Sequence, residues 1–235
     1  MDWIRSGAED GAVIVADAQT AGRGRRGRDW HSPAACNLYL STVIHCGLAP
    51  MRLLPLVGAL AVRETVAAFI ESKHIARIKW PNDVLVDNMK IAGVLVEGPE
   101  STKNPACVLG VGINANVQVN QLPPDLRWPA TSLLQIREAP VERQALLDTL
   151  LDALALWISS WRSNPDRIAP ALAAHCMTLG RRVRVSPPGQ PTWLGQASSL
   201  DGAGRLLVRD DHNTWRKVEA GDVEPADEST PSPSS

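Results

Sequence analysis

Four short apolar segments follow one another closely in the middle of this chain, and their spacing constrains the fold more than any other feature. They are IARIKW (75–80), VLV (84–86), KIAGVLVEG (90–98) and CVLGVGINAN (107–116). Pro-Asn-Asp and Asp-Asn turns separate the first three, and Asn and Asp tolerate the left-handed backbone of tight turns. Segments of strand length joined by such turns predict the hairpins of an antiparallel sheet.

Patterns on both sides of this region extend the predicted sheet and cover it. Residues 12–18 (AVIVADA) and 37–46 (NLYLSTVIHC) are expected to be strands, the first of them buried. Apolar residues at helical spacing predict helices from Pro50, over 140–162 and over 165–175. Together these elements predict an α+β fold, with a mixed, largely antiparallel sheet and packed helices.

The composition excludes several classes of protein. The chain has 235 residues, with 24 Lys and Arg against 25 Asp and Glu, so a broad basic surface for nucleic acid is not expected. No apolar run approaches the roughly eighteen residues of a membrane-spanning helix, and no secretion signal is evident. The four cysteines form no Cys-x-x-Cys pair, which favours free thiols in a reducing compartment. We therefore expect a cytoplasmic protein without a membrane partner.

The texture of the sequence changes after Gly180, where four or five short strands alternate with turns rich in Gly, Pro, Asp and Asn. This spacing predicts a small β-barrel of about fifty residues. The final segment, PADESTPSPSS, is almost entirely polar or Pro and predicts a disordered tail. The expected division is a main domain over 1–176, a barrel over 177–224 and a tail over 225–235.

The most unusual stretch is AGRGRRGR (21–28), in which the seven residues after Ala21 are four Arg and three Gly. Glycine lets backbone amides approach an anion, and the arginine fork matches phosphate and carboxylate oxygens. Two interpretations follow: a loop that closes over a small anionic ligand, or an RGG-like segment that grips RNA without sequence preference. The stretch belongs to a long predicted loop (19–33) between core strands, which favours the small anion.

A second cluster is KWPND (79–83), where a basic residue ends a strand and the next turn carries two oxygen-bearing side chains. Such a corner can stack a base on Trp80 and hold Asp83 near a magnesium ion. An ordinary hairpin turn gives the same pattern, so the cluster alone does not decide between the two interpretations.

Two glycine-containing strands suggest a place where something packs closely. Lys90 opens an apolar strand, either as an exposed edge charge or beside a ligand slot, since the small residues Ala92 and Gly93 follow it. Glycines also alternate at Gly110 and Gly112, so a backbone or a ligand must approach that strand.

Taken in order and with their spacing, GRGRRGR followed by Trp30, KWPNDVL, KIAGVLVE and GVGINAN resemble the motifs of the biotin protein ligases. The resemblance covers residues 12–116 closely and continues less specifically through ATSL (130–133) and the helices. About fifty residues near the C-terminus resemble that family's small SH3-like β-barrel. The resemblance therefore implies an α+β catalytic domain of the class II synthetase and biotin ligase type, followed by such a barrel.

The resemblance also implies an activity that uses ATP and Mg²⁺. The biotin carboxylate attacks the α-phosphate of ATP to give biotinyl-5′-AMP and pyrophosphate. A lysine amine of a biotin carboxyl carrier protein then displaces AMP, and the implied partner is the carrier protein of acetyl-CoA carboxylase. A lipoate-type ligase of the same fold is the nearest alternative. A nucleic-acid-binding module that uses the Arg/Gly loop is the alternative from another class.

The same resemblance assigns roles to individual positions. The implied catalytic residues are Lys90, between the biotin carboxylate and the α-phosphate, and Arg25. The implied biotin-binding residues are Gln19, Arg23, Gly24, Arg25, Lys90 and Gly93. The implied ATP- and adenylate-binding residues are Arg26, Arg28, Trp30, Asn82, Asp83 and Asn114. Among these, Trp30 is expected near the adenine, Arg26 and Arg28 in a closing loop, and Asp83 near magnesium.

Two features usual in the family have no counterpart here. The eleven residues before Ala12 contain no Ser-Thr-Asn motif, which in the family holds the ureido head of biotin, and Ser41-Thr42 and Ser101-Thr102 lack the Asn. We therefore expect either a start set at an internal Met or a shortened chain. The winged-helix domain of some relatives is not evident, so no DNA binding is expected, and the oligomeric state is left open.

Overall fold

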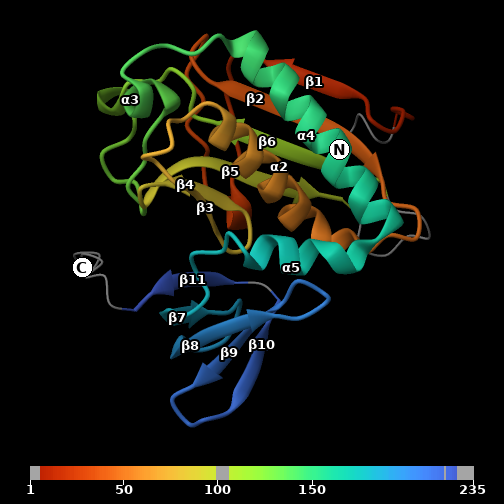
Figure 1. Ribbon diagram of the computed structural model, residues 1–235, viewed down its shortest axis with the longest axis vertical. Helices are drawn as coiled ribbons and strands as arrows, with labels where there is room; N and C mark the ends of the chain where they lie inside the picture. Colours follow the sequence, from red (N-terminus) through yellow and green to blue (C-terminus); the bar gives the residue numbers. More distant parts are fainter. Residues whose placement is uncertain (1–5, 99–105, 220, 227–235) are drawn as a thin grey trace.

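A computed structural model describes residues 6–98, 106–219 and 221–226, and it contains two antiparallel sheets (Figure 1). The larger sheet has six strands in the order β1-β2-β6-β5-β4-β3. Its strands are β1 (Val13–Ala16), β2 (Leu38–His45), β3 (Ala76–Lys79), β4 (Asp83–Val86), β5 (Met89–Glu97) and β6 (Ala106–Ile113). The hairpins β3-β4 and β4-β5 confirm the sheet predicted from the central apolar segments.

Two helices, α2 (Leu54–Ala68) and α4 (Arg143–Ser163), lie over one face of this sheet (Figure 1). The shorter helix α3 (Leu133–Arg137) lies beyond one end of the strands, and α5 (Ile168–Ala173) lies next to the second sheet. The 3₁₀ turns are η1 (Arg25–Gly27), η2 (Met51–Leu53), η3 (Val119–Gln121) and η4 (Pro165–Arg167). The predicted helices are confirmed, and Pro55 lies in the first turn of α2, where proline is tolerated. Helix α2 approaches the sheet closely at Gly58, where a Cβ would lie 2.7 Å from Val94. The first helix is therefore seated directly on β5.

Strand β1 differs from its prediction, because it is not buried. Val13, Ile14 and Val15 are 39%, 49% and 45% exposed. The strand pairs with β2 on one side, and no described residue pairs with its other side. The apolar run therefore marks a sheet edge rather than a core strand.

The second sheet follows the predicted change of texture after Gly180. Its order is β10-β9-β8-β7-β11, with β7 (Arg182–Ser186), β8 (Trp193–Leu200), β9 (Leu206–Asp210), β10 (Trp215–Val218) and β11 (Asp222–Pro225). Five short strands are confirmed, but β10 and β11 are the two ends of the ladder, and the described residues form no closed barrel. Pro225 pairs with Val183, so the predicted start of the tail at 225 is wrong, and residues 227–235 lie outside the described part.

The two sheets are joined at the KWPND turn. The indole Nε1 of Trp80 donates to the carbonyl of Gly204, in the β8–β9 turn, at 3.0 Å, and the backbone N of Trp80 donates to Thr178 Oγ1 at 3.0 Å. The ring is only 2% exposed, so the expectation that Trp80 offers a face for stacking a base is wrong. Its role is to anchor the second sheet beside the first.

Within the described residues, no helix is long and apolar enough to cross a membrane. The four thiols are free, as the sequence predicted. Cys46 and Cys107 are buried with their Sγ atoms 3.8 Å apart, whereas Cys36 and Cys176 are partly exposed.

Candidate active site

The Arg/Gly stretch lies in the long loop predicted for it, and part of this loop folds back on itself as a small hairpin closed by the isolated bridge between Arg23 and Asp29. The backbone N of Trp30 donates to Gly22 O at 2.9 Å, and that of Gly24 donates to Arg28 O at 2.6 Å. Arg26 and Gly27 have φ angles of 60° and 72° at the tip, a left-handed turn that glycine favours. We call residues 22–30 the Arg/Gly hairpin. These bonds fix the backbone from which the four arginine side chains extend, and Glu97, Asn82 and Asp222 receive their guanidinium groups.

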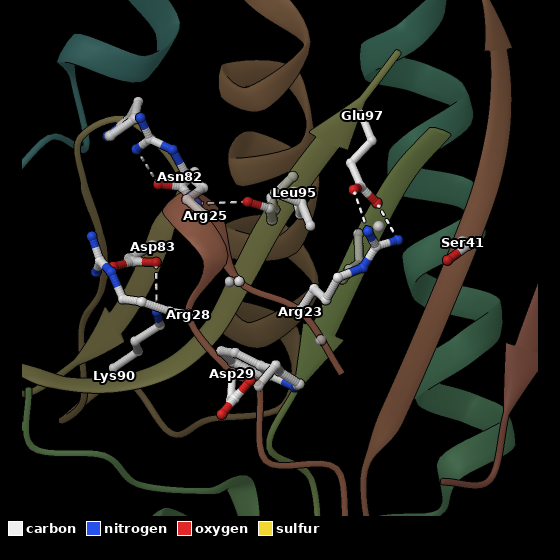
Figure 2. A pocket seen from close by; sticks show the side chains of 18 of the residues that line it. Arg23, Arg25, Arg28, Asp29, Ser41, Asn82, Asp83, Lys90, Leu95 and Glu97 are labelled. Atoms are coloured by element: carbon white, nitrogen blue, oxygen red, sulfur yellow. Dashed lines mark hydrogen bonds and ion pairs between the residues drawn. The ribbon is translucent and has the colours of Figure 1, made fainter. Parts of the chain in front are cut away.

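A cavity of about 270 Å³ lies between this hairpin and the sheet face opposite α2 (Figure 2). We call it the first cavity. The predicted site residues that line it are Gln19, Arg23, Gly24, Arg25, Arg28, Trp30, Asn82, Asp83, Lys90 and Gly93. Residues far apart in the sequence therefore converge on one hollow. Asp222 of the second sheet also lines it.

The floor of the first cavity is made by glycines beneath the Trp30 ring. A Cβ on Gly112 would lie 2.6 Å from Trp30 atoms, and one on Gly93 would lie 3.2 Å from the same ring. Gly112 and Gly93 thus accommodate an aromatic side chain of the protein itself, whereas Gly110 does not meet the ring. The indole Nε1 of Trp30 is buried against Gly112 and has no hydrogen-bond partner among the described residues.

Lys90 and Asp83 form the charged centre of the cavity. Lys90 Nζ lies 2.7 Å from Asp83 Oδ1 and 5.2 Å from the centroid of a Trp30 ring. Burial alone would raise the pKa of Asp83, but Lys90 and Lys79 hold it below its usual value, so the carboxylate is ionised. Lys90 is therefore neither an edge charge in solvent nor a free cation, but one half of a fixed pair.

Arg25 reaches across the cavity to the KWPND turn (Figure 2). Its Nη1 donates to Asn82 Oδ1 at 3.0 Å, while Asn82 Nδ2 donates to Val94 O at 2.6 Å. Burial lowers the pKa of Arg25, and the nearby Asp83 partly offsets this effect. The amide of Asn82 thus ties the hairpin to the sheet.

Asp222 in β11 gathers three guanidinium groups. Arg26 Nη1 lies 2.9 Å and Arg127 Nη1 2.8 Å from its Oδ2, and Arg28 pairs with its Oδ1. Burial would raise the pKa of Asp222, but hydrogen bonds from Arg127 and Arg28 bring it down to about 2. Arg127 also pairs with Glu224 at 2.6 Å. The second sheet therefore holds the hairpin by charge.

Two further predicted residues near the hairpin, Arg23 and Gln19, contact side chains other than the Lys90–Asp83 pair. Arg23 extends away from the Lys90 pair toward Glu97, 3.2 Å away, and its side chain is 62% exposed (Figure 2). Gln19 Oε1 accepts a hydrogen bond of 2.7 Å from Ser32. Arg26, which pairs with Asp222, does not line the first cavity.

A second cavity of about 170 Å³ adjoins the first and shares Trp30, Lys79, Asp83 and Lys90 with it. Asn114 lines this cavity rather than the first, and its Nδ2 donates to Thr131 O at 3.0 Å. Its walls also include four residues that were not singled out in the sequence, namely Leu122, Leu126, Arg127 and Trp128. They lie in the irregular segment 117–130, where an Arg-Trp pair after two prolines was the available signal.

The acidic residues form no preassembled metal centre. Within the described chain, no group of three His, Cys, Asp or Glu side chains is placed to hold an ion. Asp83, which the resemblance places near magnesium, is paired with Lys90 through its Oδ1. A magnesium ion held mainly by phosphates needs only one or two carboxylates from the protein.

Comparisons with known proteins agree with this geometry. Residues 2–114 match the model of the Biotin/lipoate A/B protein ligase family. The chain is 39% identical over 223 residues to the biotin--[acetyl-CoA-carboxylase] ligase of Mycobacterium tuberculosis, covering 93% of this chain and 80% of that protein. It is 30% identical to the ligase of the same name from Paracoccus denitrificans, covering 88% of this chain and 87% of that protein.

A solved structure gives the same result. The biotin protein ligase from Aquifex aeolicus in complex with biotin and ATP superposes with a TM-score of 0.79 at 26% identity, covering 93% of this chain and 90% of that chain. Family motifs, overall identity and fold therefore agree, and the chain belongs to the biotin protein ligase family.

Proposed function

We propose that this chain is an ATP-dependent ligase that activates biotin as biotinyl-5′-AMP and transfers the biotinyl group to a lysine of a biotin carboxyl carrier protein. The observation that carries the proposal is the convergence of Lys90 and Arg25 on one cavity that also holds the ring of Trp30. The arginine side chains that the RNA interpretation needs are already bound to Glu97, Asn82 and Asp222, which argues against that alternative.

The first step brings two anions together. The carboxylate oxygen of biotin forms a bond to the α-phosphorus, the bond to the bridging oxygen breaks, and pyrophosphate leaves with the electron pair. Lys90 would lie between the two anions and offset their repulsion, and Arg25 would close over them. No nucleophile of the protein is required, because fixed cations that need little reorganisation supply the stabilisation.

The second cavity is the proposed place of the nucleotide base, with Asn114 and Trp128 beside it. Trp30, which the resemblance places near the adenine, borders both cavities. Magnesium brought with ATP would be held by the phosphates with Asp83 as a protein ligand, and it would neutralise phosphate charge. The residue roles assigned above are part of this proposal.

In the second step, the lysine amine of the carrier attacks the biotinyl carbonyl, loses a proton, and AMP leaves. We propose the carrier of acetyl-CoA carboxylase as acceptor, because two relatives are named for that enzyme. We also propose the cytoplasm as the compartment, a catalytic unit over 1–176, and a unit over 177–224 corresponding to the family's SH3-like barrel.

The decisive experiment is biotin-dependent exchange of labelled pyrophosphate into ATP, with lipoate in a parallel reaction. Exchange that requires biotin and is lost in Lys90→Ala supports the proposal. The exposed Lys73, which pairs with Glu71 on the surface, provides the matched control Lys73→Ala. Exchange driven by lipoate but not by biotin would assign the lipoate-type alternative instead.

A further inference from the structure

Lys79 is the last residue of β3, and its side chain lies at the junction of the two cavities. It lines both of them and also borders a third, much smaller cavity against Val223 and Glu224 of β11. Its Nζ lies 5.1 Å from the centroid of the Trp128 ring. Throughout the described chain, its ammonium has no hydrogen bond and no ion pair within 4.0 Å.

The other cations around the two cavities differ from Lys79 in this respect. Each of these other cations in the described chain has an oxygen acceptor. The pairs are Arg23–Glu97, Arg25–Asn82, Arg28–Asp222, Arg127–Asp222 and Lys90–Asp83. Lys79 therefore contributes positive charge at the junction that no neighbouring anion takes up in direct contact.

Burying the ammonium of Lys79 costs free energy, and its contact with the Trp128 ring offsets that cost only in part. Burial lowers the pKa of Lys79, and the more distant Asp83, Glu224 and Asp222 counteract this effect. A cation–π contact recovers some of the attraction that an ammonium loses on leaving water, but less than a bound anion would. The group that the junction lacks is an anion.

We propose that Lys79 is a further catalytic residue of the adenylation step, binding the part of ATP that leaves as pyrophosphate. The inference rests on the proposed function. When the biotin carboxylate bonds to the α-phosphorus, the bond to the bridging oxygen breaks and its electron pair passes to pyrophosphate. An ammonium beside the β- and γ-phosphates stabilises that charge without any proton transfer.

The division of work between the two lysines follows from their partners. Lys90 is held by Asp83 beside the Trp30 ring, at the floor of the first cavity. Lys79 lies on the side of Trp128, where the nucleotide is proposed to bind. Arg28 and Arg127 are on the same side, but Asp222 already neutralises part of their charge. Lys79 is thus the cation available to the leaving group.

The test compares the two half-reactions in Lys79→Met, which keeps the aliphatic stem, and in Lys79→Arg, which keeps the charge. Biotin-dependent exchange of labelled pyrophosphate measures the first step. Transfer of biotin from preformed biotinyl-5′-AMP to a carrier domain measures the second. Lys73→Met is the matched surface control. Thermal unfolding of each variant checks that the chain folds.

We expect Lys79→Met to lower the exchange rate roughly 100-fold, comparable to the loss of one oxyanion donor. The KM for biotin and the rate of transfer from biotinyl-5′-AMP should stay within twofold, and Lys79→Arg should recover part of the exchange. Exchange within threefold of wild type, or equal losses in both half-reactions, would overturn the inference. Failure of the proposed function would look different, because the wild-type chain itself would show no biotin-dependent exchange.

Discussion

Arg26 and Asp222, 196 positions apart in the sequence, form an ion pair of 2.9 Å that links the tip of the Arg/Gly hairpin to strand β11. Arg28 and Arg127 share the same carboxylate. A single acid of the second sheet thus opposes three guanidinium groups at the edge of the cavity. The hairpin is held in place before any phosphate enters.

This arrangement predicts that Asp222→Asn destabilises the protein in a pH-dependent way. The folded pKa of Asp222, about 2, lies below its ordinary value of 3.8, so its stabilising contribution is complete above about pH 4 and is lost as the pH falls through 2. We expect a loss of about 1–2 kcal/mol at pH 7, since one pKa unit corresponds to about 1.4 kcal/mol.

Urea unfolding of Asp222→Asn and wild type at pH 7 and pH 3 measures this difference. Asp211→Asn, which breaks the exposed pair with Arg182, is the control and should change stability by less than about 0.5 kcal/mol. An equal effect of the two substitutions would contradict the structural importance of the three-arginine cluster.

Arg25→Gly is predicted to release biotinyl-5′-AMP from the site. The substitution removes the bond to Asn82 that ties the hairpin to the sheet, and water then reaches a mixed anhydride that hydrolyses readily. Retention of labelled adenylate on a filter should fall at least tenfold, and bystander proteins should become biotinylated. Arg52→Gly, at an exposed position in η2, should retain the adenylate. Unchanged retention in Arg25→Gly would count against the closing role.

Gly112→Ala is predicted to weaken biotin binding by displacing the Trp30 ring. The added Cβ would lie 2.6 Å from ring atoms, and overpacking of this kind typically costs about 1–3 kcal/mol. Gly110→Ala is the matched control on the same strand, since its Cβ would meet no atom closer than 3.6 Å. Isothermal titration with biotin should show at least a tenfold weaker affinity for the first variant only. Equal affinities would show that the ring does not shape the biotin pocket.

The thiols are predicted to fall into two reactivity classes. Burial raises the pKa of all four thiols, but only Cys46 and Cys107 are also buried from solvent, so neither of these two should react with iodoacetamide at pH 8 while the chain is folded. Cys36, which is partly exposed, should react first. Mass spectrometry of peptides from folded and urea-unfolded protein distinguishes the classes. Rapid labelling of Cys107 in the folded protein would contradict the packed core between β2 and β6.

The sequence predicted the parts of the fold that depend on local patterns. Turn residues at 82–83 and 87–88 specified the hairpins, and the apolar face of 140–162 specified α4. The burial of β1 was predicted wrongly, because an apolar run does not reveal whether a neighbouring strand exists on both sides. A small β-barrel was predicted from strand spacing, and its five short strands are confirmed. Spacing alone does not determine whether the last strand pairs with the first.

The cavity shows the same division between local and long-range information. Arg25 and Lys90 stand in recognisable motifs, so their candidacy was visible from the residues. Asp222 and Trp128 were not selected, because their importance comes from contacts with Arg26 and Lys79, which only the folded chain brings near. The glycine alternation at 110–112 predicted a close approach, which the structure shows at Gly112, but the identity of the approaching group, Trp30, required the structure.

The hydrogen bond of the Trp80 indole also affects what happens when the chain is shortened to its first sheet. Its N–H is satisfied by Gly204, so a polypeptide ending at residue 176 would lose this acceptor and uncover a large aromatic surface. Such a truncated fragment is expected to melt earlier and to aggregate. Removing the C-terminal sheet would therefore test the integrity of the first sheet as much as any separate contribution of the second.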